Sequence, residues 1–435
     1  MRLLTKLLVL SCTLVLASCE VKVKNVPPPA PSPSPAAETQ PTPSAKPAPS
    51  VIPAATAVPA SPTPAVTTVQ PLQNVPNDNA KAPHIAVFKG SVDGVKKPYG
   101  AQNNAAYAAW LNRNVVWAED TQPGATWDNM TGQTWQLAPW SNWKKVVPGR
   151  RLILNICIIP GPWDGSGPQT GKNAGIPVSL EDGAAGKYNE FYKKLAENLV
   201  KYGLEDSILR LGCEFNGGWF AWRAQSDAKA KAFAGYFREI VKTMRSVPGA
   251  EGLKFDWNVG LGWCSFDPEN AWPGDEYVDF VGIDTYDDCY APNTYPFAKN
   301  ASEAEKDRIR KKVWHDHILS GKFGLNYWRD FARKHGKPMS FPEWGVNNKP
   351  DGHGGGDNPY FIEQMYEFIN NPENNVAYHS YFDYQAGDGH HQLSPTRDGK
   401  IVTEFPRAAE KFRELFSLPP ASGQAGAPPQ PLPVD

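Results

Sequence analysis

Two glutamates stand where apolar runs of this sequence end, and their type and placement suit acid–base and nucleophilic chemistry. Glu214 follows the aliphatic run 207–212, and Glu343 follows the run 338–341. Hydrolysis of a glycosidic bond with retention needs two carboxyl groups about 5 Å apart, one to protonate the leaving oxygen and one to attack the anomeric carbon. Their pKa values would be coupled, because ionising one carboxyl raises the pKa of the other. We therefore predict that Glu214 and Glu343 form a catalytic pair.

The residues around Glu214 are of kinds that contact sugars. Trp219 and Trp222 offer flat apolar faces to the C–H groups of a sugar ring, and Asn216 offers both donors and an acceptor to hydroxyl groups. Arg210 lies among apolar neighbours, so we expect it to point inward and hold the nucleophile ionised. The alternatives are a strand end with two core tryptophans and, for the arginine, a buried ion pair with a structural role only.

Other acidic, aromatic and histidine side chains follow the remaining apolar runs, and we predict that some of them contact the sugar. These candidates are Trp163, Trp263, Asp284, Trp344, Asp120, Asp287, His390 and His391. Each has a structural alternative, since a polar residue at a strand end often caps the next helix. No spacing of Cys and His suggests zinc, and we expect no catalytic metal and no cofactor.

Eight short apolar runs, most of them continuous rather than alternating, are typical of parallel strands buried on both faces. They are residues 84–88, 114–117, 151–159, 207–212, 254–259, 278–283, 338–341 and 376–382. Amphipathic helical segments separate most of them. Strand and helix repeated eight times predict a (β/α)8 barrel, with its chemistry at the C-terminal ends of the strands. An open doubly wound sheet is the alternative, but no Gly-rich phosphate loop follows the first run.

The N-terminus has the pattern of a bacterial lipoprotein signal. Arg2 and Lys6 precede the apolar stretch 7–16, and Leu-Ala-Ser then precedes Cys19, which resembles a lipobox. We predict a signal over the first 19 residues and lipidation of the cysteine, with an ordinary cleaved signal as the alternative. Glu20 resembles the sorting pattern of the Gram-negative outer membrane, so we expect a lipid-anchored protein of the cell envelope.

Composition divides the rest of the chain into a folded region and two flanks. Residues 20–83 and 419–435 are rich in Pro and Ala and poor in large side chains, so we expect a disordered tether and tail around a domain at 84–418. A formal net charge of −1, from 44 basic and 45 acidic residues, argues against nucleic acid as a partner. The 15 Trp and 16 Tyr favour a sugar-binding cleft. We expect a monomer that acts on a polysaccharide.

Four cysteines lie in the predicted domain, namely Cys157, Cys213, Cys264 and Cys289. An exported domain meets an oxidising compartment, and four cysteines allow three full pairings. Cys264 and Cys289 follow neighbouring predicted strands, so we predict a disulfide between them.

The motif from Arg210 to Trp222 resembles the Arg-x-x-His-Glu-x-Asn-Gly-x-Trp-Phe-x-Trp run of glycoside hydrolase family 26, the β-mannanase family. The segments 278–286 and 341–345 resemble the family's sixth strand and its nucleophile segment. The resemblance implies that Glu214 is the acid/base and Glu343 the nucleophile, supported by Tyr286 and Arg210. It also implies that Trp219 and Trp222 line the subsite of the reacting sugar.

One residue departs from the family pattern. Cys213 stands where mannan-cleaving members usually have a His that contacts the substrate, which leaves hydrolysis intact and the identity of the glycan open. Three functions therefore remain: an endo-acting β-glycan hydrolase, a non-catalytic polysaccharide-binding envelope lipoprotein, and a transglycosylase acting on the organism's own exopolysaccharide. The presence of both glutamates together with Tyr286 and Arg210 favours the hydrolase.

Overall fold

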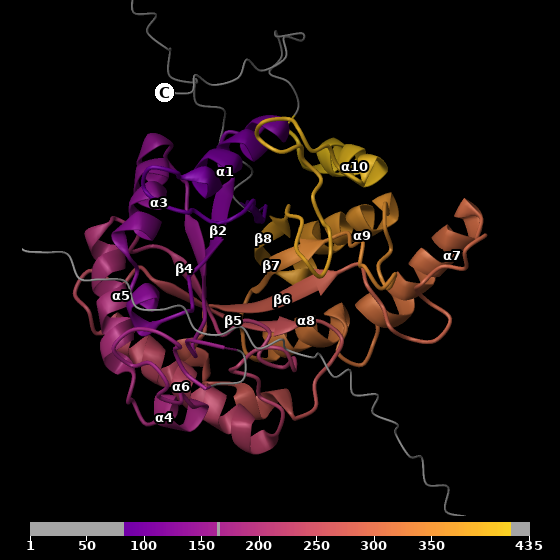
Figure 1. Ribbon diagram of the computed structural model, residues 1–435. Helices are drawn as coiled ribbons and strands as arrows, with labels where there is room; N and C mark the ends of the chain where they lie inside the picture. The colour runs from indigo at the N-terminus through magenta and orange to yellow at the C-terminus, as the bar shows by residue number, and fades with distance from the viewer. Residues whose placement is uncertain (1–81, 163–165, 419–435) are drawn as a thin grey trace, which may run out of the picture. The chain divides into compact units, whose positions relative to one another are not determined.

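Eight parallel strands close into a barrel, in which each strand pairs with the next along the chain and the last pairs with the first. The computed structural model describes residues 82–162 and 166–418 of the chain (Figure 1). The strands are β1 (His84–Phe88), β2 (Trp117–Thr121), β3 (Leu152–Ile156), β4 (Ile208–Leu211), β5 (Lys254–Gly260), β6 (Phe280–Tyr286), β7 (Met339–Gly345) and β8 (Val376–Phe382). The predicted (β/α)8 barrel is confirmed, and the open sheet is excluded.

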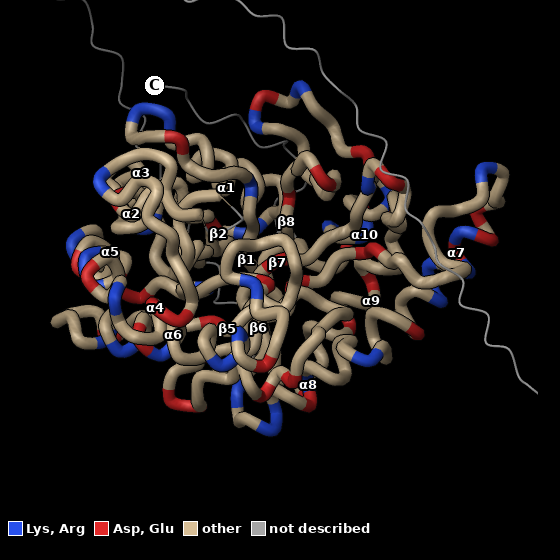
Figure 2. The backbone as a smooth tube through the Cα atoms, turned by 60° about the horizontal axis from the view of Figure 1, so that its bottom comes forward, with Lys and Arg blue, Asp and Glu red and all other residues tan. Residues whose placement is uncertain are grey.

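Helices surround the barrel and cover the outer faces of its strands (Figure 1). The α-helices are α1 (Tyr99–Trp110), α2 (Trp127–Met130), α3 (Thr134–Val146), α4 (Leu180–Ala184), α5 (Asn189–Lys201), α6 (Asp227–Arg245), α7 (Glu303–Val313), α8 (Leu325–Lys334), α9 (Pro359–Asn370) and α10 (Pro406–Phe416). Side-chain caps define several starts: Ser226 accepts the Lys229 N–H at α6, and Ser302 forms a capping box with Glu305 at α7. Lys and Arg are interspersed with Asp and Glu over the outer helices (Figure 2).

The barrel interior has an apolar layer beneath a polar one. Side chains of alternate strand residues point inward. The deeper layer is a small cluster of Ala86, Trp117, Ile153, Ile208 and Tyr378. Two residues further along β2, β3, β4 and β8, the inward positions are buried polar residues, namely Glu119, Asn155, Arg210 and Ser380. The apolar layer closes the N-terminal end of the barrel, and the polar layer lies below the C-terminal mouth.

The second strand begins at Trp117 rather than at residue 114 as predicted. The apolar residues before it gave the sequence signal, whereas Glu119 and Asp120 have the polar character of a loop. In the structure both carboxyls are buried inside the strand. Glu119 points inward to Arg210, and Asp120 points outward and accepts the Trp140 indole N–H over 2.6 Å. These carboxyls have partners on distant elements, which a local pattern cannot reveal.

The predicted disulfide between Cys264 and Cys289 is wrong, because the four cysteines of the described residues are all free. The two loops are held in different directions. Cys264 Sγ donates to the Phe266 carbonyl 3.2 Å away within its own loop, whereas the Cys289 N–H donates to the carbonyl of His353, in the loop after β7.

Several predictions concern residues that the structure does not describe: the signal, Cys19, the tether, the tail and Trp163 lie outside its ranges. No helix within 82–162 or 166–418 is long and apolar enough to cross a membrane.

Candidate active site

Glu343 lies near the C-terminal end of β7, where two donors hold its carboxylate. Arg210 Nη1 donates to Oε1 over 2.8 Å, and the Tyr286 hydroxyl donates to Oε2 over 2.8 Å. The Glu343 backbone N–H donates to Asp284 Oδ1 over 3.1 Å. Donors of this kind favour the ionised carboxylate. The side chain is 19% exposed, so the carboxyl group has an open side on which to meet a ligand.

Arg210 on β4 has a fully buried guanidinium that binds residues of four other strands. Nη1 binds Glu343 and also Glu119 on β2, and Nη2 donates to Asn258 and Asp284, each over 2.8 Å. A buried ion network is weak evidence of stability, but removing one partner leaves an unpaired buried charge. The network therefore fixes the position of Glu343 relative to the strands on the far side of the barrel.

Glu214 follows β4 and lies close enough to Glu343 for the two groups to interact electrostatically. Its backbone is left-handed, with φ of 48°, which is uncommon for a residue with a side chain. Its Oε2 accepts the Trp219 indole N–H over 2.7 Å. Burial, and next the charge of Glu343, raise the pKa of Glu214 to about 7, while the hydrogen bond from Trp219 and the charge of Arg210 oppose the rise. A carboxylate that accepts from a guanidinium and a hydroxyl, beside a carboxyl with a raised pKa, matches the division between nucleophile and acid/base.

Asn216 fastens the loop after β4 to the end of β5. Its Nδ2 donates to the carbonyls of Gly260, over 2.8 Å, and Trp263, over 2.6 Å, and its Oδ1 accepts the Gly260 N–H over 2.8 Å. Both donors of its amide are used in this way, which agrees with the role of a supporting residue. Asn216 supports the loop that carries Glu214.

Two of the predicted tryptophans offer an open ring at the site, and one does not. Trp219 is 48% exposed and Trp263 is 45% exposed. Trp222 is buried: its N–H donates to the Cys213 carbonyl over 2.8 Å, and its ring stacks on Phe220. The prediction of a sugar-facing ring is therefore wrong for Trp222. Cys213 is buried as well, so it lies behind the surface of the site.

Trp344 and Asp284 do not have the predicted role of sugar contacts. Trp344 is 0% exposed, packs on Phe361 of α9 and Phe412 of α10, and donates its N–H to His379 over 3.1 Å. Successive strand residues point to opposite faces, so its side chain points outward while that of Glu343 points inward. Asp284 is buried, and its oxygens accept from Arg210, from Asn258 and from the backbone of Glu343. It supports the position of Glu343 instead.

Four other candidates remain, namely Asp120, Asp287, His390 and His391. The first three bind structural partners. Asp120 is bound to Trp140, and Asp287 accepts from the Tyr295 hydroxyl and Asn358. His390 pairs with Glu404 over 2.8 Å at the surface. None of these contacts involves either catalytic candidate.

His391 is the one of these candidates that lies against a site residue, since its ring centroid is 4.6 Å from that of Tyr286. Its Nδ1 lies 2.8 Å from the Val346 carbonyl. Burial lowers the pKa of His391 to about 4, so the imidazole is neutral at pH 7. We assign it to the wall that orients the Tyr286 hydroxyl.

Glu119 and Asn258 belong to the site, yet neither was among the predicted site residues. Glu119 lies inside a strand that begins later than predicted, and Asn258 is the inward residue of β5 that binds both Arg210 and Asp284. Once a barrel is assumed, the only sequence signal for them is a polar residue at an inward strand position. The correct register is needed before that signal can be used.

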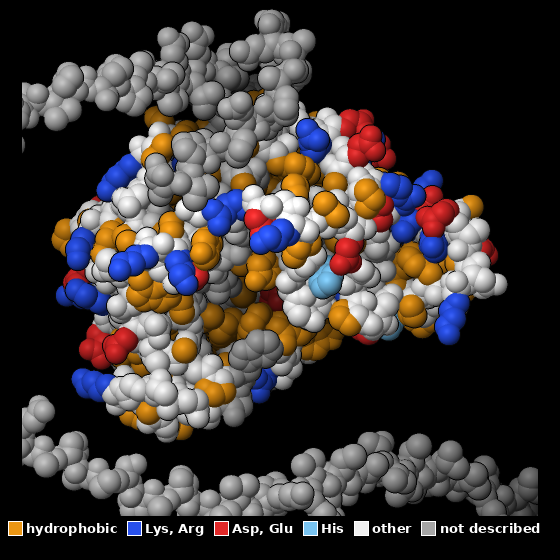
Figure 3. Space-filling view, turned by 45° about the horizontal axis from the view of Figure 1, so that its top comes forward, with side chains coloured by type: hydrophobic (Ala, Val, Ile, Leu, Met, Phe, Trp, Pro, Cys, Tyr) orange, Lys and Arg blue, Asp and Glu red, His pale blue; other side chains and the backbone are white. Residues whose placement is uncertain are grey.

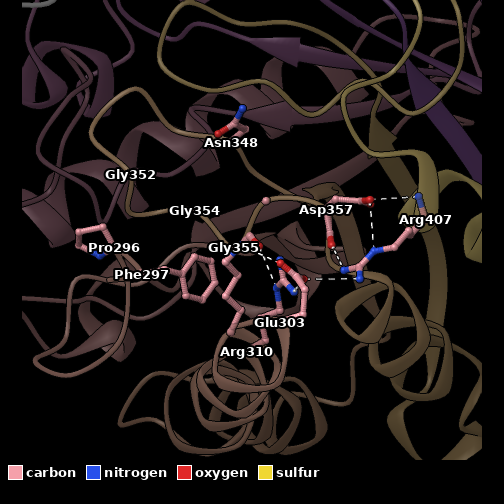
Figure 4. A pocket seen from close by; sticks show the side chains of 12 residues that line it. Pro296, Phe297, Glu303, Arg310, Asn348, Gly352, Gly354, Gly355, Asp357 and Arg407 are labelled. Carbon is pink, nitrogen blue, oxygen red and sulfur yellow. Dashed lines mark hydrogen bonds and ion pairs between the residues drawn. The ribbon is translucent and has the colours of Figure 1, made fainter. Parts of the chain in front are cut away.

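Figure 3 shows a hollow on one face of the molecule, walled mostly by hydrophobic side chains, with acidic atoms visible inside it. A separate cavity of about 610 Å³ lies beside α7 and the loop after β7 (Figure 4). Neither Glu214 nor Glu343 lines that cavity. Its charged side chains pair with one another, as Arg407 does with Asp357 over 3.4 Å, so we place no chemistry there.

Comparison with known proteins gives matches to glycan-cleaving enzymes. The model of glycosyl hydrolase family 26 matches residues 179–306. A mannan endo-1,4-beta-mannosidase of Bifidobacterium adolescentis is 32% identical over 133 residues, which are 28% of this chain and 13% of that protein. Endoglucanase H of Acetivibrio thermocellus is 31% identical over 109 residues, 23% of this chain and 12% of that protein. The matched stretches thus span about an eighth of those relatives.

Two mannanases are among the solved structures to which the chain is similar. An endo-beta-1,4-mannanase double mutant of Cellulomonas fimi has a TM-score of 0.48 and 17% identity, with 77% of this chain and 71% of that chain covered. A mannanase of Bacillus subtilis has a TM-score of 0.47 and 14% identity, with 82% and 92% covered.

The family match includes the part of the chain that carries most of the site. Residues 179–306 contain Arg210, Glu214, Trp219 and Tyr286, and Glu343 lies beyond the match. Over these residues the chain is similar to glycosyl hydrolase family 26.

Proposed function

We propose that this protein is a retaining, endo-acting β-glycan hydrolase of the mannanase type. The observation that carries the proposal is that two neighbouring carboxyls have different surroundings. Arg210 and Tyr286 donate hydrogen bonds to the Glu343 carboxylate, whereas burial and the charge of Glu343 raise the pKa of Glu214 to about 7. This is the pairing that double displacement needs.

The two displacements use the same two side chains. Glu343 attacks the anomeric carbon while Glu214 gives its proton to the leaving glycosidic oxygen, so that a glycosyl–enzyme bond forms as the glycosidic bond breaks. Glu214, now ionised, takes a proton from a water molecule. That water attacks the anomeric carbon from the vacated side, releases Glu343 and restores the proton on Glu214.

The substrate we propose is a polysaccharide with a β-1,4-linked backbone of mannose or glucose. The names of the relatives, a mannan endo-1,4-beta-mannosidase and an endoglucanase, support this class. The exposed rings of Trp219 and Trp263 also support it, since aromatic faces pack on the apolar faces of such sugars. Cys213, in place of the usual His, leaves the choice between the two backbones to experiment.

A substrate screen tests this proposal. Wild-type protein is incubated with mannans, β-glucans, xylans and the host's exopolysaccharide, and new reducing ends are measured. We expect turnover of a β-linked glycan that Glu343→Ala lowers by orders of magnitude. Binding of a glycan without new reducing ends would identify a binding protein, and longer products without net hydrolysis would identify a transglycosylase.

We also propose that the enzyme is anchored in the cell envelope of a Gram-negative bacterium through a lipid on Cys19. The Leu-Ala-Ser-Cys sequence and the Pro-rich stretch after it support this location. Such a stretch would hold the catalytic domain away from the membrane surface.

A further inference from the structure

Glu119 on β2 is the third carboxyl around Arg210. One guanidinium charge therefore faces Glu119, Asp284 and Glu343. Three ionised carboxylates beside one cation would leave two uncompensated negative charges in a buried layer, which is costly in a medium of low dielectric constant. At least one of the three is expected to bind a proton.

The hydrogen-bond donors around each carboxyl indicate which of the three binds the proton. Asp284 accepts from Arg210, from Asn258 and from a backbone N–H. Glu343 accepts from Arg210 and from Tyr286. Glu119 accepts from Arg210 through Oε1, while its buried Oε2 has no partner within the residues that the structure describes. A carboxylate oxygen can only accept, so the group with the fewest donors is the one whose charge is least supported.

We propose that Glu119 is a positioning residue that stays protonated in the resting protein and, by sharing Arg210 Nη1 with Glu343, leaves the guanidinium charge to Glu343 and Asp284. Its action on Glu343 rests on the proposed function, but its protonation does not.

The surroundings of Glu119 agree with a neutral carboxyl. The residues paired with it on β1 and β3, Phe88 and Ile153, are apolar. From β8, the buried Ser380 hydroxyl lies beside the carboxyl; it could accept the proton of a neutral Oε2, whereas a hydrogen bond that it donates would favour the ionised form. Burial raises the pKa of Glu119 to about 8, with the charge of Glu343 adding to the rise and Arg210 and Ser380 opposing it. Burial also raises the pKa of Asp284 well above its ordinary value, so it is the hydrogen-bond donors that distinguish Glu119 from Asp284.

A protonated Glu119 has a consequence for the nucleophile. A neutral carboxyl oxygen accepts a weaker hydrogen bond than an ionised one, so Arg210 Nη1 stays directed at the Glu343 carboxylate. Ionised Glu119 would compete for the same N–H group and would add a like charge beside Glu343. Glu119 thus fixes the guanidinium in place without competing for its charge.

Infrared difference spectra at pH 7 test the protonation without any substrate. Subtracting the spectrum of Glu119→Gln from that of the wild type should leave the carbonyl band of a protonated carboxyl. Asp120→Asn is the matched control: it is the next residue on β2, it points outward, and its pKa of about 6 predicts loss of an ionised carboxylate band. A carboxylate band in the Glu119 difference would overturn the proposal. If Glu119→Gln does not fold, Glu119→Met serves for the same subtraction.

Thermal unfolding gives a second readout that is independent of activity. The pKa of Glu119 is about 8 in the folded state, against 4.5 for an ordinary glutamate. Its stabilising contribution is therefore complete below about pH 4.5 and is lost as the pH rises through 8. The Tm of the wild type should fall relative to that of Glu119→Gln between pH 5 and pH 9. A difference in Tm that stays constant over the same range would mean an ionised Glu119 held by Arg210, because the group would then bind no proton in either state.

Kinetics test the positioning role. Glu119→Ala removes the acceptor for Arg210 and should lower kcat roughly 10- to 100-fold, as expected for a lost hydrogen bond to a charged group. Glu119→Gln keeps a neutral acceptor and should restore most of that loss. Equal losses in both variants would overturn a neutral role. If the wild type hydrolyses no glycan, the proposed function fails, and the spectra and melting curves still decide the protonation of Glu119.

Discussion

The indole N–H of Trp219 donates to Oε2 of Glu214 over 2.7 Å, while nearly half of the Trp219 side chain remains exposed. One residue therefore offers a ring to a sugar and holds the carboxyl that would protonate that sugar's linkage. The hydrogen bond also favours the ionised form of Glu214, against the larger effects of burial and of Glu343. The acidity of the proposed acid is thus tied to the residue that would contact the substrate.

Activity should decline on the alkaline side of neutrality. The first displacement needs protonated Glu214, whose pKa is raised to about 7, so kcat/KM should fall as the pH rises through about 7. The measurement is a pH profile of kcat/KM on a soluble glycan between pH 4 and pH 9. A profile that is flat to pH 9 would show that Glu214 is not the acid.

Trp219→Phe should move that alkaline limb upward. The substitution keeps an aromatic face but removes the N–H, and loss of a donor to the ionised form raises the pKa of Glu214 further. Trp263→Phe is the control, since Trp263 is about equally exposed and no described contact joins its ring to Glu214. A limb that stays in place in Trp219→Phe, or that moves equally in both variants, would contradict the assignment.

Tyr286→Phe should lower kcat roughly 10- to 100-fold, because the Glu343 carboxylate loses one of its two side-chain donors. Tyr290→Phe removes a hydroxyl that bonds Asp351 at the surface and should leave kcat within about twofold, as is usual for surface changes. Melting curves of both variants check that the fold is intact. Equal kcat values would remove Tyr286 from the site.

Trp344→Ala should destabilise the barrel by about 3–5 kcal/mol, the usual cost of deleting a buried tryptophan. Trp263→Ala removes a ring that is 45% exposed and should raise KM with little change in Tm. Thermal unfolding and steady-state kinetics separate the two effects. A stable Trp344→Ala variant with a raised KM would mean that Trp344 contacts substrate after all.

Cys19→Ser should move the protein from the membrane fraction to the soluble fraction, because the thiol that carries the lipid is lost. Activity on a soluble glycan should not change, since the predicted tether separates Cys19 from the catalytic domain. Fractionation of cells that express each form, followed by the reducing-end assay, is the measurement. Unchanged fractionation would rule out this anchor.

The sequence was sufficient to predict the barrel and the placement of Glu214 and Glu343 at strand ends. Continuous apolar runs separated by amphipathic helices reflect the burial of parallel strands on both faces. Arg210 was expected to point inward because its neighbours are apolar, and it does. These features depend on local sequence patterns, so they can be predicted without knowing any distant partner.

Other parts of the site depended on register and on distant partners. Trp344 follows Glu343 directly, and only the strand geometry places its side chain on the opposite face. Glu119 has the polar character of a loop residue. Only its contact with Arg210, 91 positions away, accounts for its burial. Cys264 and Cys289 likewise donate to different backbone carbonyls, those of Phe266 and His353, which a local pattern does not reveal.

Retention of configuration is the direct consequence of Glu343 attacking the anomeric carbon. The measurement is proton NMR of the new reducing end within the first moments of hydrolysis of a β-linked glycan, before mutarotation. We predict that the β-anomer appears first and that the α-anomer grows in later, because two displacements restore the starting configuration. The α-anomer as first product would mean that Glu343 acts as a base on water, and the double displacement proposed for Glu214 and Glu343 would be wrong.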